Sequence, residues 1–244
     1  MIKWIKRILL FIIVIFVVKK FYKYLPYRLE YFGHYDKIWS HRNNSIAKAN
    51  TALKYFKGIE LDLMYNKKED FLDVNHPPAK SINLSFHNYI KNLDKQPYLW
   101  LDIKNLKLEN TEEILRILNN IFSENNYPKN KVLIETRFPK ALPVFEKNGY
   151  KTIYYLPYEM YKFSNKKLDS SIQKIKSMLR HQPNVGVSFN YLDYTIINKH
   201  FPNRQKYIWM IDGLLSRNYK LAKKTLNDTN VKVVLINYKT KSHR

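Results

Sequence analysis

The stretch GIELDLM, residues 58–64, alternates apolar and acidic side chains along its length. In a β-strand, side chains two residues apart share a face, so Glu60 and Asp62 lie together on one face and the aliphatic residues on the other. Two carboxylates in this arrangement at the mouth of a barrel offer hard oxygen ligands to one Ca2+ or Mg2+ ion. The alternative to a metal site is a half-exposed strand whose acids are solvated. The residues in the surrounding segments distinguish these two interpretations.

Those segments add groups that act on phosphate esters. His41 and Arg42 precede the stretch, His76 follows it, and a short apolar run, residues 99–104, ends in Asp102 and Lys104. Histidines transfer protons, and arginine and lysine bind phosphate oxygens. Because these residues fall at the ends of successive predicted strands, they indicate a site that cleaves or transfers a phosphate ester on a metal ion.

Strand and helix patterns alternate along the chain, as in a parallel (β/α)8 barrel. After a terminal segment is set aside, the length suits one such domain. Strands are predicted at residues 37–42, 58–64, 98–103, 131–136, 151–156, 184–189, 206–211 and 231–236. Helices are predicted at residues 46–56, 110–123, 139–148, 168–179, 191–199 and 216–226. An extra segment at 71–76, with residues 83–93 behind it, is predicted to carry His76 back over the barrel mouth.

The order of these motifs resembles a known family. His-Arg at 41–42, Glu-x-Asp at 60–62, His76 and Asp-Ile-Lys at 102–104 are similar to the signature of glycerophosphodiester phosphodiesterases, which are metal-dependent TIM barrels. The resemblance continues more weakly to the run YIWMID and spans most of the chain after about residue 33. It implies an α/β fold, a (β/α)8 TIM barrel of the phosphodiesterase type over residues 30–244.

Two details look closer to the menorin family, a divergent relative with the same kind of barrel: H-x-x-N-S at residues 41–45 and H-P-P at 76–78. Asn43 stands where the phosphodiesterases usually have Gly, Pro77 where they usually have Asp, and Asp102 where they usually have the longer Glu. Metal ligation is compatible with that shortening. The departures predict a different substrate pocket.

The resemblance and the chemistry of the residues together assign a metal site and a phosphate site. Glu60, Asp62 and Asp102 are predicted to hold one divalent cation, Ca2+ or Mg2+, which would neutralise phosphate charge and polarise a phosphoryl oxygen. Arg42, with its fork geometry, and Lys104, as a point charge, are predicted to bind the other phosphate oxygens.

His41 and His76 are predicted to divide the proton transfers. One removes the proton from an attacking hydroxyl and the other protonates the leaving alkoxide, and the sequence does not distinguish which does which. Trp209 lies in a run that resembles W-x-x-N on the seventh strand of the phosphodiesterases and is the predicted substrate-stacking residue. The tyrosines that follow the strand at 151–156 are interpreted as core and rim packing.

The amino terminus carries a separate signal. Residues 8–18, ILLFIIVIFVV, are wholly apolar and have Lys or Arg on both sides. The run is short for a spanning helix, but no small-residue cleavage site follows it, so residues 1–25 are predicted to form an uncleaved, single-pass membrane anchor. A cleaved signal and a buried helix are the alternatives. A leading anchor of this kind favours an extracytoplasmic catalytic domain.

The chain is strongly basic, with 43 Lys and Arg against 20 Asp and Glu and a formal net charge of +23. Such a charge attracts polyanions, and behind a membrane anchor an anionic, phosphate-bearing lipid or glycan is favoured over nucleic acid. A purely compositional excess of Lys is the alternative. Cysteine is absent, which excludes disulfides and thiolate chemistry. The absence of a Gly-rich phosphate loop and of a G-x-S-x-G elbow disfavours nucleotide-dependent kinases and α/β-hydrolases.

These inferences predict a metal-dependent phosphodiesterase-like enzyme that acts on a glycerophosphodiester, a lysophospholipid or a phosphate-linked surface glycan. Two alternatives stay open. A non-catalytic binding or scaffold protein could use the same barrel, because fold does not fix function. A transferase could use the same metal site and pass a phosphoryl or glycosyl group of a phosphate-linked glycan to an alcohol in place of water.

Overall fold

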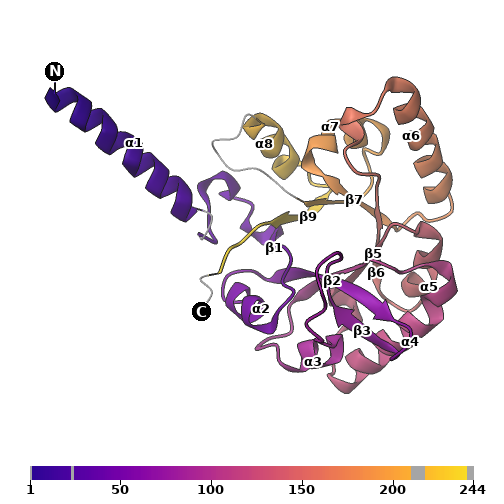
Figure 1. Cartoon of the computed structure of the whole chain (residues 1–244). Coiled ribbons are helices and arrows are strands. Elements are labelled where there is room, and N and C mark those ends of the chain that lie inside the picture. Colours follow the sequence, from indigo (N-terminus) through magenta and orange to yellow (C-terminus); the bar gives the residue numbers. More distant parts are fainter. Residues whose placement is uncertain (1, 23–24, 210–217, 241–244) are drawn as a thin grey trace.

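A computed structural model describes residues 2–22, 25–209 and 218–240 of the chain. Within these residues, eight parallel strands close into a barrel surrounded by helices, because the first strand pairs both with the second and with the last (Figure 1). The predicted (β/α)8 fold is therefore confirmed. The barrel strands are β1 (Ile38–Ser40), β2 (Gly58–Asn66), β4 (Tyr98–Ile103), β5 (Val132–Thr136), β6 (Lys151–Tyr155), β7 (Gly186–Asn190), β8 (Lys206–Trp209) and β9 (Val231–Ile236).

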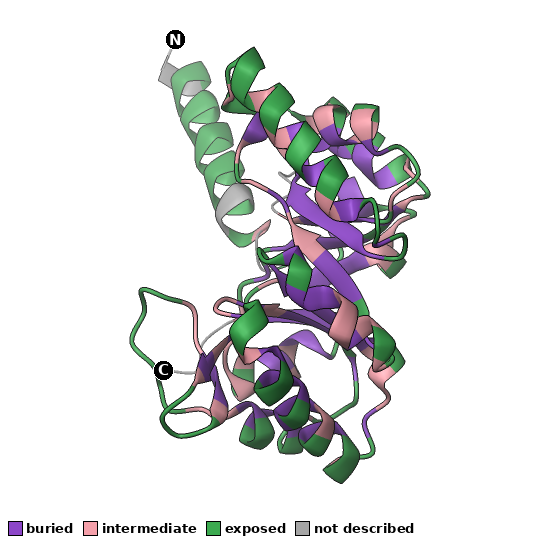
Figure 2. Cartoon of the chain, turned by 90° about the vertical axis from the view of Figure 1, so that its right-hand side faces the viewer, coloured by how far each residue is buried: buried purple, intermediate pink, exposed green. Residues whose placement is uncertain are grey.

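Helices cover the outside of this barrel, and their outward faces are exposed while the strands are buried (Figure 2). The α-helices after the amino-terminal one are α2 (Ile46–Ala52), α3 (Phe86–Lys91), α4 (Thr111–Glu124), α5 (Leu142–Lys147), α6 (Asn165–Leu179), α7 (Tyr194–His200) and α8 (Tyr219–Asn227). Short 3-10 turns lie at η1 (Leu29–Tyr31), η2 (Tyr35–Lys37), η3 (Leu108–Asn110), η4 (Lys129–Lys131), η5 (Pro139–Ala141), η6 (Met160–Lys162) and η7 (Tyr191–Asp193).

Most predicted elements are confirmed, and β4 and β9 begin and end at the predicted residues. The helix predicted at 46–56 ends earlier, at Ala52, and the one predicted at 168–179 begins earlier, at Asn165. The early start was missed because the first turn of α6 is exposed and has no apolar residue to mark it. Residues 210–211 of one predicted strand and 216–217 of one predicted helix lie outside the described residues.

The predicted excursion after β2 is also present. Strand β3 (Phe71–Val74) folds back antiparallel on the carboxyl end of β2, with Leu63 opposite Val74. The chain then returns to the barrel mouth, where the backbone N–H of Asn75 donates to the carbonyl of Asp62 at 3.1 Å. This hairpin places His76 beside the carboxylates of β2.

Two apolar layers hold the fold together. Large side chains fill the barrel interior, so it is a packed core and not a pore. The outer layer lies between strands and helices; in α4 the residues at helical spacing, such as Ile114, Leu118 and Ile121, are buried. The interior layer consists of Trp39, Trp100, Leu133, Ile153, Tyr207, Val233 and Leu235.

The amino-terminal helix α1 (Ile2–Tyr22) extends away from the barrel (Figure 1). Its apolar side chains are exposed from Trp4 to Val18, so none of these side chains belongs to either core layer. Among the described residues, no helix combines the length and apolar character that crossing a membrane requires. The membrane anchor at residues 1–25 stays a prediction.

Candidate active site

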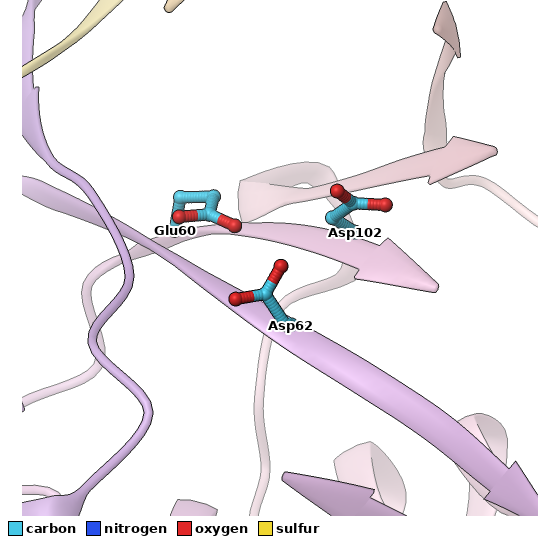
Figure 3. A group of neighbouring side chains, drawn as sticks. All are labelled: Glu60, Asp62 and Asp102. Carbon is cyan, nitrogen blue, oxygen red and sulfur yellow. The ribbon is translucent and has the colours of Figure 1, made fainter. Parts of the chain in front are cut away.

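Three carboxylates meet at the carboxyl ends of β2 and β4. Glu60 and Asp62 share one face of β2, and Asp102 lies opposite Asp62 in the register of β4. Figure 3 shows the three side chains pointing toward a common region, and one oxygen from each lies within 4.8 Å of the others. Glu60 and Asp62 are almost fully buried, at 2% and 1% exposure. The alternation in GIELDLM therefore groups these acids as predicted.

The turn after β1 holds the two carboxylates of β2 in place. Arg42 adopts a left-handed backbone conformation, with φ of 54°, and its N–H donates to Glu60 Oε2 at 2.6 Å. Asn44 makes a paired contact with Asp62: its Nδ2 donates to Asp62 Oδ2 at 2.7 Å, and its Oδ1 accepts from the Asp62 N–H at 2.9 Å. A left-handed conformation costs an Arg residue about 1–2 kcal/mol, which the surrounding contacts must offset.

Lys104 completes the cluster. Its Nζ lies 2.6 Å from Asp62 Oδ1 and also donates to Asp102 Oδ2. Burial lowers the pKa of the Lys104 ammonium, but the attraction of Asp102 and Asp62 outweighs it, so the pKa is raised above its ordinary value. Lys104 therefore stays charged and bridges two of the acids.

The residues present fit a hard divalent cation. Burial raises the pKa of Glu60 well above its usual range, and repulsion from Asp62 and Asp102 raises it further. Burial likewise raises the pKa of Asp102, despite the nearby Lys104. One ammonium against three carboxylates leaves the cluster net negative when the acids are ionised, and buried like charges are relieved either by protonation or by a bound cation. Carboxylate oxygens are the ligands that Ca2+ and Mg2+ prefer.

Two histidines border this cluster. Nδ1 of His41 lies 3.1 Å from Asn237 Oδ1, and Nε2 lies 3.5 Å from Glu60 Oε2. An amide oxygen only accepts, so Nδ1 is assigned the proton and Nε2 is free to accept one. Burial lowers the pKa of His41 to about 4; the Asn237 contact raises it and Arg42 lowers it further. His41 is therefore neutral at pH 7. His76 Nε2 lies 3.1 Å from Arg42 Nη2, and because a guanidinium only donates, this nitrogen is also an acceptor.

Aromatic rings form the wall beyond the carboxylates. Trp209 and Tyr158 stack, with ring centroids 5.7 Å apart and an interplanar angle of 4°. The ring centroid of Tyr155 lies 5.8 Å from that of Trp209. The Arg137 guanidinium lies over the Tyr155 ring, 4.4 Å from its centroid. Such a contact between a cation and a ring face fixes the orientation of both side chains.

All eight predicted site residues line one cavity of about 350 Å³, which we call the carboxylate cavity. They are His41, Arg42, Glu60, Asp62, His76, Asp102, Lys104 and Trp209. Other lining residues were missed or interpreted as packing: Glu135, Arg137, Tyr155 and Tyr158. Glu135 lies near the end of β5 and Arg137 directly follows it, so the rule that barrel sites form at the carboxyl ends of strands would have found both residues. His34, His87, His181 and His200, interpreted from the sequence as surface or structural, do not line this cavity, and His243 lies outside the described residues.

Glu135 is a fourth acid in the barrel interior. It is 3% exposed and accepts hydrogen bonds from Trp100 Nε1 at 2.8 Å and from the hydroxyl of Ser188. Burial raises its pKa to about 8, with a further contribution from the charge of Asp102. Glu135 is therefore mostly protonated at pH 7 and neutral in this core.

The raised pKa predicts a specific pH dependence of stability for Glu135→Gln. The unfolded chain releases the Glu135 proton near the ordinary value of 4.5 and the folded chain near 8, so this group costs stability as pH rises through that window. Gln keeps the shape and cannot ionise. We expect the unfolding free energy of the variant, relative to the wild type, to be higher at about pH 9 than at about pH 5.

Denaturant unfolding in the presence of a chelator measures this difference. Glu112→Gln, at an exposed position of α4, is the control and should show no such trend. A difference between Glu135→Gln and the wild type that stays constant or shrinks with rising pH would mean that Glu135 ionises normally in the folded protein.

Comparison with known proteins bears on the fold. No protein-family model matches the sequence, and neither does any curated protein. Solved structures do match. A phosphodiesterase from Oleispira antarctica, in complex with the product sn-glycerol-3-phosphate, is 13% identical, with a TM-score of 0.59 over 82% of this chain and 92% of that one. A glycerophosphodiester phosphodiesterase from Parabacteroides distasonis is 13% identical, with a TM-score of 0.58 over 82% of this chain and 92% of that one. One from Thermotoga maritima is 11% identical, with a TM-score of 0.57 over 82% of this chain and 93% of that one.

At this level of identity the likeness shows the fold: the chain has a TIM barrel like that of the glycerophosphodiester phosphodiesterases. The resemblance to the menorin family stays a prediction. The activity and the roles of the site residues are inferred below from the geometry of the carboxylate cavity.

Proposed function

We propose that this protein is a metal-dependent phosphodiesterase-like enzyme acting on a glycerophosphodiester, a lysophospholipid or a phosphate-linked surface glycan. One observation carries the proposal: three buried acids, two histidines with accepting Nε2 atoms, an arginine and a lysine converge on one cavity at the carboxyl ends of the barrel strands. A structural ion-pair network does not need two histidines and an open cavity.

Each part of the carboxylate cavity then has a role. Glu60, Asp62 and Asp102 hold a divalent cation, which when bound supplies positive charge to the phosphoryl group. Arg42, whose Nη2 already lies at the cavity wall beside His76, binds phosphate oxygens through its fork of donors. Lys104, which pairs with Asp62 and Asp102, adds a further positive charge.

The two histidines take different proton-transfer roles. His41 is neutral and has an accepting Nε2, so we assign it as the general base that receives the proton of the attacking hydroxyl. His76 sits on the loop after β3, and its Nε2 accepts from Arg42 in this structure. When Arg42 turns to bind phosphate, this nitrogen is released and can take up a proton, so we assign His76 as the acid that gives that proton to the leaving alkoxide. The Trp209 and Tyr158 rings are placed to pack against the organic part of the substrate.

The glycerophosphodiester class is favoured because similar structures are glycerophosphodiester phosphodiesterases and one of them holds sn-glycerol-3-phosphate. To test this, the protein is incubated with a panel of glycerophosphodiesters, lysophospholipids and phosphate-linked glycans, and the products are identified. Each compound is tried with Ca2+ or Mg2+, and with and without a competing alcohol. Release of the free phosphate monoester supports hydrolysis, whereas phosphate transferred to the alcohol supports a transferase. The absence of any product across the panel would favour a binding protein.

The amino-terminal segment gives a prediction about location. The apolar side chains of α1 are exposed and outside both core layers, so membrane attachment through residues 1–25 is part of the proposal, with the catalytic domain on the extracytoplasmic side. Deleting residues 1–25 is expected to move the protein from the membrane fraction to the soluble fraction, with the barrel still folded.

Sedimentation with membranes in high salt measures this, since salt removes attachment that depends only on the basic charge. The control keeps the helix and removes charge by replacing Lys166 and Lys174, both exposed on α6, with Ala; this variant should stay with the membrane. If the deletion variant still sediments in high salt, the anchor prediction is wrong or incomplete.

A further inference from the structure

A second cavity, the basal cavity, lies at the amino ends of the barrel strands, away from the carboxylate cavity. Tyr98 and Lys151 are the first residues of β4 and β6, and Lys131 directly precedes β5. Because the barrel strands are parallel, residues at their amino ends face the opposite mouth from Asp102 and the other acids. The cavity measures about 300 Å³, and its lining includes Trp39, Tyr98, Tyr207 and four lysines.

Aromatic rings make the inner wall of the basal cavity, and two glycines make room for them. A Cβ atom at Gly58 would lie 2.2 Å from the Trp39 ring, and one at Gly186 would lie 2.5 Å from the Tyr207 ring. Trp39 also packs against Tyr98, with ring centroids 5.7 Å apart. The rings are therefore held in fixed positions by backbone that cannot carry a larger side chain.

The Trp39 ring lines the basal cavity, and its indole N–H is a reporter for this mouth of the barrel. Trp39 is 4% exposed, and its Nε1 has no hydrogen-bond partner among the described residues. Because this nitrogen is inaccessible to solvent, it is not itself a contact for an occupant of the cavity, but its N–H resonance reports on changes around the Trp39 ring.

The rim supplies positive charge without a balancing acid. Lys57, Lys131, Lys151 and Lys232 line the cavity, and neither Asp nor Glu is among the lining residues. Lys131 and Lys232 donate to the backbone carbonyls of Gln96 and Thr229, each at 3.0 Å, and none of the four lysines pairs with a carboxylate in the described part of the chain. Four like charges around one opening repel one another and attract an anion.

We propose that the basal cavity binds a small anion that carries two or more phosphate groups, such as a pyrophosphate or a nucleoside polyphosphate. The volume suits a small molecule and not a polymer. Four ammonium groups match the charge of linked phosphates better than that of a single one, and lysine binds phosphate as a point charge. A ligand with a flat ring gains a further contact with Tyr98 or Trp39. This site is independent of the proposed activity, because it shares no residue with the carboxylate cavity.

The indole N–H resonances of the full-length, 15N-labelled protein test the proposal, because Trp39 and Trp209 report on opposite mouths of the barrel. The protein is titrated with inorganic pyrophosphate, with ATP and with sulfate. All three titrations contain a chelator and have the same ionic strength. Trp39→Phe identifies the Trp39 resonance. We expect pyrophosphate and ATP to shift the Trp39 resonance in a saturable way, with sulfate much weaker. Tighter binding of ATP than of pyrophosphate would mean that the adenine ring contributes to the affinity. Equal binding would mean that the affinity comes from the phosphate groups alone.

Two matched double variants separate a site from general charge attraction. Replacing Lys57 and Lys151 with Ala removes two rim charges, and replacing Lys166 and Lys174 removes two exposed charges on α6. Both pairs are exposed, so folding should be kept. We expect the first pair to weaken binding at least about tenfold and the second to leave it nearly unchanged. An unshifted Trp39 resonance, a shift of Trp209 alone, or equal weakening by both pairs would overturn the proposal.

Discussion

Replacing His41 or His76 with Ala is expected to lower the turnover of a phosphodiester by roughly 10²-fold or more, because each residue transfers a proton in the reaction. His41 presents an accepting Nε2 toward the acids, and His76 lies 3.1 Å from the guanidinium of Arg42. Both side chains are at the barrel mouth and outside the apolar layers, so folding should be largely spared. Steady-state rates on the best substrate of the panel measure the effect.

His87→Ala is the matched control. This histidine is exposed, pairs with Glu124 on the outside of the barrel, and does not line the carboxylate cavity. We expect its rate to equal that of the wild type. Near-ultraviolet circular dichroism of each variant separates lost chemistry from lost fold. Wild-type turnover no faster than that of His41→Ala and His76→Ala would remove both residues from the mechanism.

Glu60→Ala is expected to abolish binding of Ca2+ or Mg2+ to the protein. Glu60 is buried, supplies one of the three oxygens within 4.8 Å of one another, and has no nearby acid to replace it on β2 other than Asp62. Calorimetry on the full-length protein measures binding directly. Glu60→Gln keeps the side-chain volume and an acceptor for the Arg42 N–H, so it should lose the metal with little loss of stability.

Glu112→Ala, at the exposed start of α4, is the control and should bind metal like the wild type. No measurable binding to the wild type, or binding to both Glu60 variants that equals binding to the wild type, would contradict a metal site at these carboxylates. Binding that is lost only in Glu60→Ala would assign the effect to local folding and not to ligation.

The barrel could be predicted from the sequence because its strands are short apolar runs with clear boundaries. The bounds of β4 and β9 were predicted residue by residue, and the alternation in β2 placed Glu60 and Asp62 on one face. Such patterns depend on local chain geometry, which the sequence carries directly. The order of the motifs selected eight site residues, and all eight line one cavity in the structure.

The parts that could not be predicted depend on packing between distant segments. Lys104 was expected to bind phosphate, but it lies against Asp62 and Asp102, a contact that requires the register of β2 and β4. Glu135 is a single acid in an apolar run, and its environment is set by Trp100 and Ser188 from other strands. The stacking of Tyr158 on Trp209 depends on the path of a loop, which no periodic pattern defines.

The measurement that tests the central claim most directly is phosphodiester cleavage by the wild-type protein as divalent metal is removed and returned. We expect release of a phosphate monoester from at least one member of the panel with Ca2+ or Mg2+, loss of this activity with a chelator, and recovery when the metal is added back. No cleavage of any diester with either metal, or cleavage that is indifferent to the chelator, would contradict a metal-dependent phosphodiesterase at the carboxylate cavity.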